Sequence, residues 1–150
     1  MIGDWLDGGQ IGKNVVLPRA YAENSRNVSG TKLFAIEIVR FCASLPHTED
    51  ASVIRRQLLR AGTAVGANYR AVCRSRSSAD FIAQLGLVIE EADEAAYWLE
   101  ILADARLVAS GTMDALRREA EELTRIFVSS RATARRNARA LRTQNAITNR

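Results

Sequence analysis

Cysteine, histidine and lysine are scarce in this 150-residue chain. Its two cysteines, Cys42 and Cys73, do not form a CxxC pair, which argues against a disulfide scaffold and against a zinc site. His47 is the only histidine, so no second imidazole is available for a metal pair or a proton relay. No apolar run approaches the about 20 residues that span a bilayer, and the N-terminus does not resemble a secretory signal. These absences predict a cytoplasmic protein with no membrane partner.

Motifs of familiar enzyme classes are also missing. The sequence contains no GxSxG, P-loop or GxGxxG pattern. The acidic run from Glu90 to Glu94 lacks the ExxH companion that di-metal sites in helical bundles use. Cys73 has arginines nearby but no histidine close to it in the sequence, so a catalytic thiol is not indicated. The sequence therefore predicts a protein that is not an enzyme and that holds no cofactor and no metal.

Charge is abundant, and it is segregated along the chain. Residues 51–79 hold six arginines and no acid, and residues 131–150 hold six more arginines and no acid. Residues 80–122 hold eleven acids against three arginines. Segregation of this kind is typical of a basic binding surface. For residues 51–79 the alternative stays open that an acidic helix neutralises a basic one inside the fold.

Periodicity predicts four helices after an N-terminal leader. The leader, residues 1–28, shows no sustained period and is expected to be poorly ordered. Helices are predicted at about 29–44, 48–73 and 77–107, and from about 112 past 127. The expected fold is all-α, an antiparallel up-down four-helix bundle over residues 29–130 with an arginine-rich C-terminal extension, residues 131–150. This extension is rich in alanine and arginine, so the last helix is expected to continue at least partly into it.

The third predicted helix has the clearest pattern. Its apolar residues alternate four and three apart over three heptads, as in a coiled-coil seam. The last predicted helix continues this pattern, whereas in the first helix a set beginning with Leu33 follows the helical period. The seam residues are Phe81, Leu85, Val88, Ala92, Ala95, Leu99 and Leu102; those of the last helix are Leu116, Ala120, Leu123 and Phe127; those of the first are Leu33, Ile36, Val39 or Arg40, and Ala43.

Arginines gather on one face of the second predicted helix. With about 100° per residue, Arg60, Arg70 and Arg74 fall within about 40° of Arg56 and opposite the apolar stripe. Arg76 extends this basic ridge into the following turn, "RSRSS". Within the second helix no acid stands four residues from Arg56, Arg60, Arg70 or Arg74 to balance these charges, and guanidinium groups suit phosphate well. The candidate nucleic-acid-binding residues are Arg56, Arg60, Arg70, Arg74 and Arg76 in the ridge, and Arg131, Arg135, Arg136, Arg139 and Arg142 in the extension.

Two further patterns concern packing. Gly62 and Gly66 lie one turn apart in the second helix, where each glycine costs about 1 kcal/mol relative to alanine, so close approach of another helix backbone is expected there. The third helix carries a second apolar stripe mixed with glutamates, which predicts a subunit interface; the alternative is a wide core face with Trp98 at its edge. The predicted interface residues are Leu87, Glu90, Glu94, Tyr97, Trp98 and Ile101.

The segments "RAGTAVGAN" (60–68), "RSRSSADF" (74–81) and "EEADEAAYWLE" (90–100) resemble one known four-helix-bundle family. It contains proteins encoded in intervening sequences of bacterial large-subunit ribosomal RNA genes and the accessory variability determinant of diversity-generating retroelements. The resemblance covers roughly residues 33–127 and implies a ring-like homopentamer with a basic surface. In the retroelement members that surface binds nucleic acid and a partner reverse transcriptase, and the family implies no catalytic residues. Where many members read "ANIAEG", this chain reads "ANYRAV", which makes the turn more basic.

Two functions follow from the sequence. The first is sequence-independent binding of RNA or DNA phosphates by a non-enzymatic homo-oligomer, and the resemblance adds the role of an accessory protein of a reverse transcriptase. Since no aromatic residue is interleaved with the arginines, stacking on bases is not indicated and binding should weaken steeply with salt. The alternative is a homo-oligomeric protein-interaction scaffold whose arginine ridge pairs with the acidic helix of a neighbouring subunit.

Overall fold

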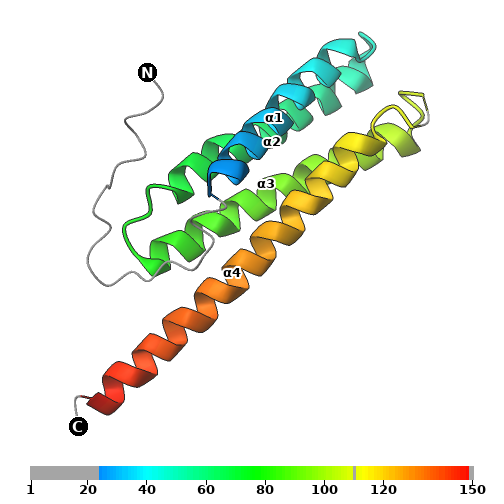
Figure 1. Cartoon of the computed structure of the whole chain (residues 1–150). Helices are drawn as coiled ribbons and strands as arrows, with labels where there is room; N and C mark the ends of the chain where they lie inside the picture. The colour runs from blue at the N-terminus through cyan, green and yellow to red at the C-terminus, as the bar shows by residue number, and fades with distance from the viewer. Residues whose placement is uncertain (1–23, 110, 149–150) are drawn as a thin grey trace, which may run out of the picture.

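Four helices make up the computed structural model, which describes residues 24–109 and 111–148. They are α1 (Asn24–Ser44), α2 (Glu49–Val72), α3 (Ser78–Asp104) and α4 (Asp114–Thr148) (Figure 1). Within these residues there is no strand, so the all-α prediction is confirmed. Residues 1–23 of the predicted leader lie outside the described residues, whereas Asn24–Val28, also assigned to the leader, are helical and belong to α1.

Consecutive helices run antiparallel and pack side by side. The crossing of α1 and α2 brings Gly66 of α2 beside Thr31 of α1, and the crossing of α3 and α4 brings Arg131 of α4 beside Ile82 of α3. α2 packs on both α1 and α3, α4 packs mainly on α3, and α1 touches α4 only lightly. This arrangement is consistent with the predicted four-helix bundle.

The heptad seam of α3 forms the centre of the core. Six of its seven predicted residues are buried, and Phe81, near the start of the helix, is partly buried against the core. α2 turns its predicted apolar stripe inward, including Leu58 and Val65. The Tyr69 and Phe127 rings join α2 to α4, with 5.0 Å between their centroids. The sequence pattern therefore gave the correct inner faces of α2, α3 and α4.

The predicted inner face of α1 was wrong. Leu33 and Val39 are 60% and 48% exposed. The buried face is shifted around the helix and consists of Thr31, Phe34, Ile38, Phe41, Cys42 and Leu45. Apolar residues occur in both registers of this helix, and the register that wins buries the larger side chains, two of them phenylalanines.

Close approach of α1 and α2 explains the paired glycines. A Cβ atom on Gly66 would lie 3.2 Å from the carbonyl oxygen of Thr31, and one on Gly62 would lie 2.8 Å from two side-chain carbons of Ile38. The hydroxyl of Thr31 donates to the Asn27 carbonyl within α1, so this buried polar group is satisfied. The predicted close approach of a helix backbone is confirmed at Gly66, whereas at Gly62 the neighbour is the Ile38 side chain.

The helix ends follow the polar signals in the sequence. Thr48 is the N-cap residue of α2, although its side chain makes no capping hydrogen bond, and Ser77 caps α3 by accepting a hydrogen bond from the Asp80 amide at 3.1 Å. At the other end of α3, Arg106 and Gly111 adopt positive φ values of 53° and 83° in the connection to α4. α4 then continues unbroken into the extension that starts at residue 131.

Candidate nucleic-acid interface

One end of the bundle collects arginines from α2, the α2–α3 turn and α4. At this end α2 finishes, α3 begins and α4 leaves the other helices (Figure 1). Residues 66–86 and 127–148, which meet there, contain eight arginines and one carboxylate, Asp80. Arg131 is half-buried and the others are exposed. We call these seven exposed side chains the basic end: Arg70, Arg74, Arg76, Arg135, Arg136, Arg139 and Arg142.

Asp80, the one carboxylate within residues 66–86, is bonded to the backbone of the α2–α3 turn. The amide of Arg76 donates to Asp80 Oδ2 at 3.0 Å, and the Asp80 amide donates to Ser77 Oγ. The turn is thus closed by a reciprocal cap and leaves the guanidinium groups of Arg70, Arg74 and Arg76 exposed. Among the residues that the structure describes, no carboxylate forms an ion pair with any of these three.

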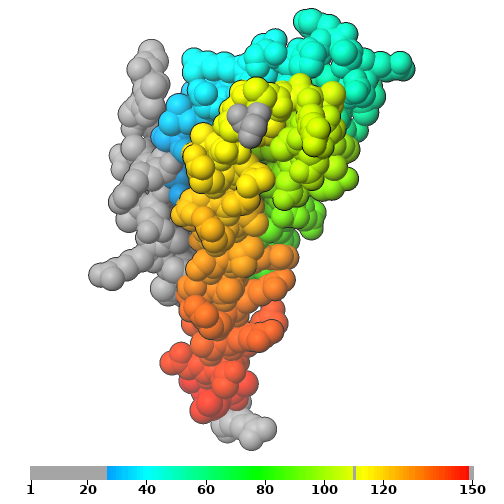
Figure 2. All heavy atoms as spheres, turned by 90° about the vertical axis from the view of Figure 1, so that its right-hand side faces the viewer, coloured from blue at the N-terminus to red at the C-terminus, as the bar shows by residue number. Residues whose placement is uncertain are grey.

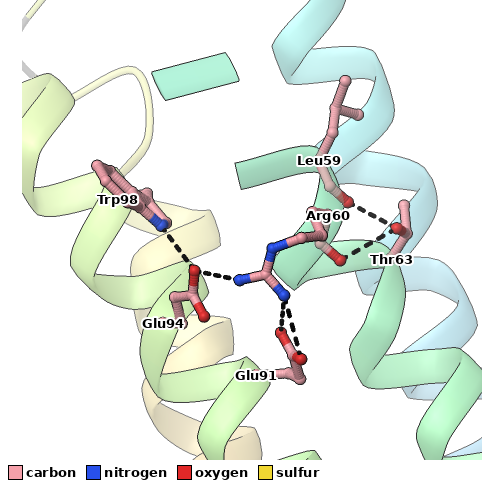
Figure 3. Close-up of polar contacts among 6 residues, drawn as sticks. All are labelled: Leu59, Arg60, Thr63, Glu91, Glu94 and Trp98. Atoms are coloured by element: carbon pink, nitrogen blue, oxygen red, sulfur yellow. Dashed lines mark hydrogen bonds and ion pairs between the residues drawn. The ribbon is translucent and has the colours of Figure 1, made fainter. Parts of the chain in front are cut away.

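Arg60 is different, because acids of α3 surround it (Figure 3). Its guanidinium donates to both Glu91 oxygens at 3.2 and 3.3 Å and to Glu94, and the Trp98 indole N–H also donates to Glu94, at 3.1 Å. The hydrogen bond to Glu94 and the Glu91 charge raise the pKa of Arg60. The hydrogen bonds from Arg60 and then Trp98 lower the pKa of Glu94. Arg60 therefore joins α2 to α3 within one chain.

The predicted ridge on α2 is consequently divided. Arg56 is exposed and, within the described part of the chain, forms no ion pair, but it lies 14 positions before Arg70, about 21 Å along the helix. Arg55, which was not predicted as a site residue, donates to the carbonyl oxygens of Leu45 and Pro46 at 3.2 and 2.7 Å and closes the α1–α2 turn. The ridge thus consists of three parts. Arg56 stands alone, Arg60 is ion-paired, and the remaining arginines are exposed at the basic end.

Arg131 lies in the contact between α3 and α4. Its Nε donates to the Ile82 carbonyl oxygen at 3.1 Å, and its guanidinium covers Gly86, where a Cβ atom would lie 2.9 Å from one terminal nitrogen. Gly86 is buried and leaves room for this side chain. The sequence analysis grouped Arg131 with the binding residues of the extension. It missed the contact with α3 because that contact depends on Gly86, 45 positions earlier in the chain.

The other arginines of the extension project from α4. Arg135, Arg139 and Arg142 are exposed, and Arg136 donates to the hydroxyl of Thr133 at 3.1 Å on the same helix. Figure 2 shows the orange and red end of α4 extending beyond the other helices. A large ligand could therefore approach these side chains and those of the α2–α3 turn from the same end.

The predicted interface residues of α3 separate into two groups. Glu90 is exposed, and so are Leu87 (47%) and Tyr97 (51%). Trp98 and Ile101 are partly buried against the core, and the Tyr97 and Trp98 rings meet edge to face with 5.0 Å between centroids. Glu94 is already bound to Arg60 of its own chain. Of the predicted interface residues, Leu87, Glu90 and Tyr97 are thus the exposed ones.

The described residues contain no group of three or more acidic, histidine or cysteine side chains that could hold a metal ion. Burial raises the pKa of the Cys42 thiol to about 11, so this sulfur is not a thiolate nucleophile at neutral pH. None of the helices described is long and apolar enough to cross a membrane.

The fold and this surface define a class: all-helical bundle proteins with a basic end. The chain matches the family described as 23S rRNA-intervening sequence proteins over residues 24–129, and it belongs to that family. It is also similar to a crystal structure of a protein with unknown function from the S23 ribosomal protein family of Bacteroides thetaiotaomicron. The two share 28% sequence identity with a TM-score of 0.68, over 73% of this chain and 98% of that one. No functionally curated protein matches the chain.

Proposed function

We propose that this protein is a non-enzymatic homo-oligomer that binds the phosphate backbone of nucleic acid through its basic end. The observation that carries the proposal is the group of seven exposed arginines, from two separate parts of the chain, that form no ion pair with a carboxylate of the described residues. Unbalanced positive charge is unfavourable by itself and is stabilised by a polyanion. The guanidinium fork also donates two hydrogen bonds to one phosphate.

The mode of binding follows from what accompanies these arginines. The nearest aromatic residues along the chain are Tyr69, Phe81 and Phe127: Tyr69 and Phe127 are buried in the core, and Phe81 is partly buried against it, so none presents an open ring for stacking on bases. Contacts would therefore be made to phosphates, with little dependence on base sequence. Each phosphate contact contributes about 0.9 to the slope of log K against log salt for duplex DNA. If all seven arginines take part, the slope would be about −6.

Assembly and protein partners are a finer part of the proposal. The family resemblance implies a ring-like homopentamer, and the exposed Leu87 and Tyr97 on α3 offer an apolar surface for subunit contacts. A reverse transcriptase is the protein partner implied by the retroelement members. In a ring, several basic ends would contact one nucleic acid together, and affinity would rise through multivalency.

A scaffold function is the second candidate. In that case Arg70, Arg74 and Arg76 would pair with the acidic helix of a neighbouring subunit, where Glu90 and Asp93 are exposed on α3. Arg60 supports the chemistry of this alternative, because it pairs with α3 glutamates within its own chain. Replacing Arg70, Arg74 and Arg76 with glutamine would break the oligomer in this case and would leave it intact if these residues bind nucleic acid.

The test of the proposed function is fluorescence anisotropy of labelled RNA and DNA, titrated over salt. Truncation after residue 130 would remove Arg131 from its contact with α3, so substitutions are the better probe. Arg70→Gln, Arg74→Gln and Arg76→Gln together should weaken binding and reduce the salt slope by up to about 2.7. The control replaces Arg40, Arg118 and Arg125, three exposed arginines elsewhere, and should change the slope little. Absence of binding by the wild-type protein at low salt would refute the proposal.

A further inference from the structure

The last turns of α4 pack against none of the other residues that the structure describes. Ala134 is the last buried residue of this helix, and every residue from 139 to 148 is exposed. These ten residues extend about 15 Å as a helix. Figure 1 shows this end of α4 continuing past the start of α3 and the α2–α3 turn. We call residues 135–148 the arm.

Helix formation in the arm depends on favourable and unfavourable contributions to the stability of the helix. Alanine and arginine are good helix formers, and the arm continues a helix that is already formed, so no new nucleus is needed. Without tertiary packing, however, each added residue gains little. Arginines repel one another at spacings of three or four in the pairs 131–135, 135–139, 136–139 and 139–142, and no acid follows Glu122 to offset them. The last turn contains no basic residue to interact favourably with the helix dipole.

The contacts of Arg131 show which side of α4 faces α3. Arg131, Arg135, Arg139 and Arg142 recur at spacings that keep them on one side of α4. Arg131 contacts Ile82 and Gly86, so this side is the one that faces α3. α3 begins at Ser78, only four residues before Ile82. Beyond Arg135 this side of α4 therefore continues past the N-terminus of α3. It runs toward the end of the bundle that carries Arg74 and Arg76.

The lack of exposed aromatic residues in the arm and the α2–α3 turn favours double-stranded over single-stranded nucleic acid as the ligand. Proteins that bind single strands without sequence preference stack bases on aromatic side chains, and the arm and the α2–α3 turn contain no exposed aromatic residue. A duplex keeps its bases stacked and is bound through phosphates on two strands. Arginines on two separate elements, the turn and the arm, are suited to phosphates of two strands.

We propose that the arm is a helix completed by its ligand: residues 135–148 become stably helical when their arginines, together with those of the α2–α3 turn, close on a nucleic-acid duplex. Phosphates remove the repulsion between the arginines and supply the contacts that the arm lacks in the free protein. The proposal rests on the proposed function and adds to it the duplex form of the ligand and coupled folding of the arm.

Hydrogen–deuterium exchange of the full-length protein, read by mass spectrometry, tests the proposal segment by segment. The probes are a 20-base-pair RNA duplex, the DNA duplex of the same sequence and one RNA strand alone, with binding of each measured by anisotropy on the same samples. In the free protein, amides of residues 139–148 should exchange almost as fast as in an unfolded peptide. A bound duplex of either kind should slow their exchange at least about tenfold, and the single strand should do so much less.

A charge variant separates repulsion in the arm from ligand contact. Arg135→Gln, Arg139→Gln and Arg142→Gln together should slow exchange in the free arm, because the repulsion is gone, and should abolish the further protection by a duplex. The control, Arg40→Gln, Arg118→Gln and Arg125→Gln, removes the same charge from exposed positions elsewhere and should behave as wild type.

Several results would overturn the proposal. Duplex binding without added protection in the arm would refute coupled folding while leaving the proposed function intact. Equal protection by the single strand would refute the duplex preference. Protection in the free protein that grows with protein concentration would show that a second copy occupies the arm. Absence of any binding at low salt would refute the proposed function as well.

Discussion

At the scale of single residues, the neighbours of an arginine decide what its guanidinium can bind. Arg60 and Arg70 lie on the same face of α2, yet Arg60 sits opposite Glu91 and Glu94, and Arg70 lies past the acidic part of α3. Because α2 and α3 are antiparallel, the middle of one helix faces the middle of the other. The acids of α3 therefore neutralise one arginine and leave those near the turn available.

The Arg60–Glu94 contact predicts a pH dependence of stability. The pKa of Glu94 is lower in the folded protein than its ordinary value, so its contribution is present above that ordinary value and is lost as pH falls through the folded-state pKa. Glu94→Gln should lower the melting temperature at pH 7, by a modest amount because the pair is partly exposed. By pH 3 the difference from wild type should shrink, as measured by circular dichroism melts. An equal difference at both pH values would contradict this.

The glycines of α1 and α2 allow a matched test of helix crossing. Gly62→Ala places a Cβ atom 2.8 Å from the buried, branched Ile38 side chain and should destabilise the fold by about 1–3 kcal/mol. Gly30→Ala in α1 meets nothing within 4 Å and should stabilise it by up to about 1 kcal/mol through helix propensity. Urea unfolding measures both. Similar free-energy changes for the two variants would show that propensity, not the crossing, sets the role of Gly62.

At the scale of helices, the contact between α3 and α4 sets the position of the arm. Gly86→Ala would displace the flexible end of Arg131, which can move, and the added alanine favours the helix, so stability should change by less than about 1 kcal/mol. Arg131→Ala removes the hydrogen bond to Ile82 and the packing of the side chain, and should destabilise the protein by about 1 kcal/mol or more. Urea unfolding distinguishes the two variants, and a larger loss of stability from Gly86→Ala than from Arg131→Ala would contradict this account of the contact between Arg131 and α3.

Helix boundaries and inner faces were predictable where one pattern dominated. The α3 seam has apolar residues in a single register, and Ser77 caps α3 where the sequence placed its start. α1 offered apolar residues in two registers, and only the packing of Phe34 and Ile38 against the other helices selects one. Pairings between distant residues, such as Arg60 with Glu94 or Arg131 with Gly86, depend on the register of antiparallel neighbours, which periodicity within one helix does not contain.

At the scale of the whole molecule, basic and acidic surfaces occupy different parts of the bundle. The basic end carries seven exposed arginines, while residues 87–104 of α3 carry six acids and no arginine or lysine. The exposed apolar residues Leu87 and Tyr97 lie on this acidic helix. Subunit contact through α3 would thus bury apolar surface while leaving the basic end accessible, so that assembly and nucleic-acid binding use separate surfaces.

Two exposed leucines allow the subunit interface to be tested. Leu87→Asp on α3 should dissociate the proposed oligomer, because it places a charge in the apolar contact. Leu33→Asp on α1 is the matched control: Leu33 is 60% exposed against 47% for Leu87, and it lies outside the predicted interface. Native mass spectrometry gives the assembly state directly. A monomeric wild-type protein, or equal dissociation by both variants, would place the interface elsewhere or refute it.

The same variants connect assembly to affinity for nucleic acid. If several basic ends of one oligomer contact one long duplex, dissociation by Leu87→Asp removes multivalency and should weaken apparent binding at least about tenfold. Each protomer keeps its seven exposed arginines, so binding to a duplex too short for two protomers should be almost unchanged. Anisotropy with a short and a long duplex separates these effects. Equal weakening on both lengths would mean that the α3 face contributes directly to the ligand contact, since loss of multivalency affects only the long duplex.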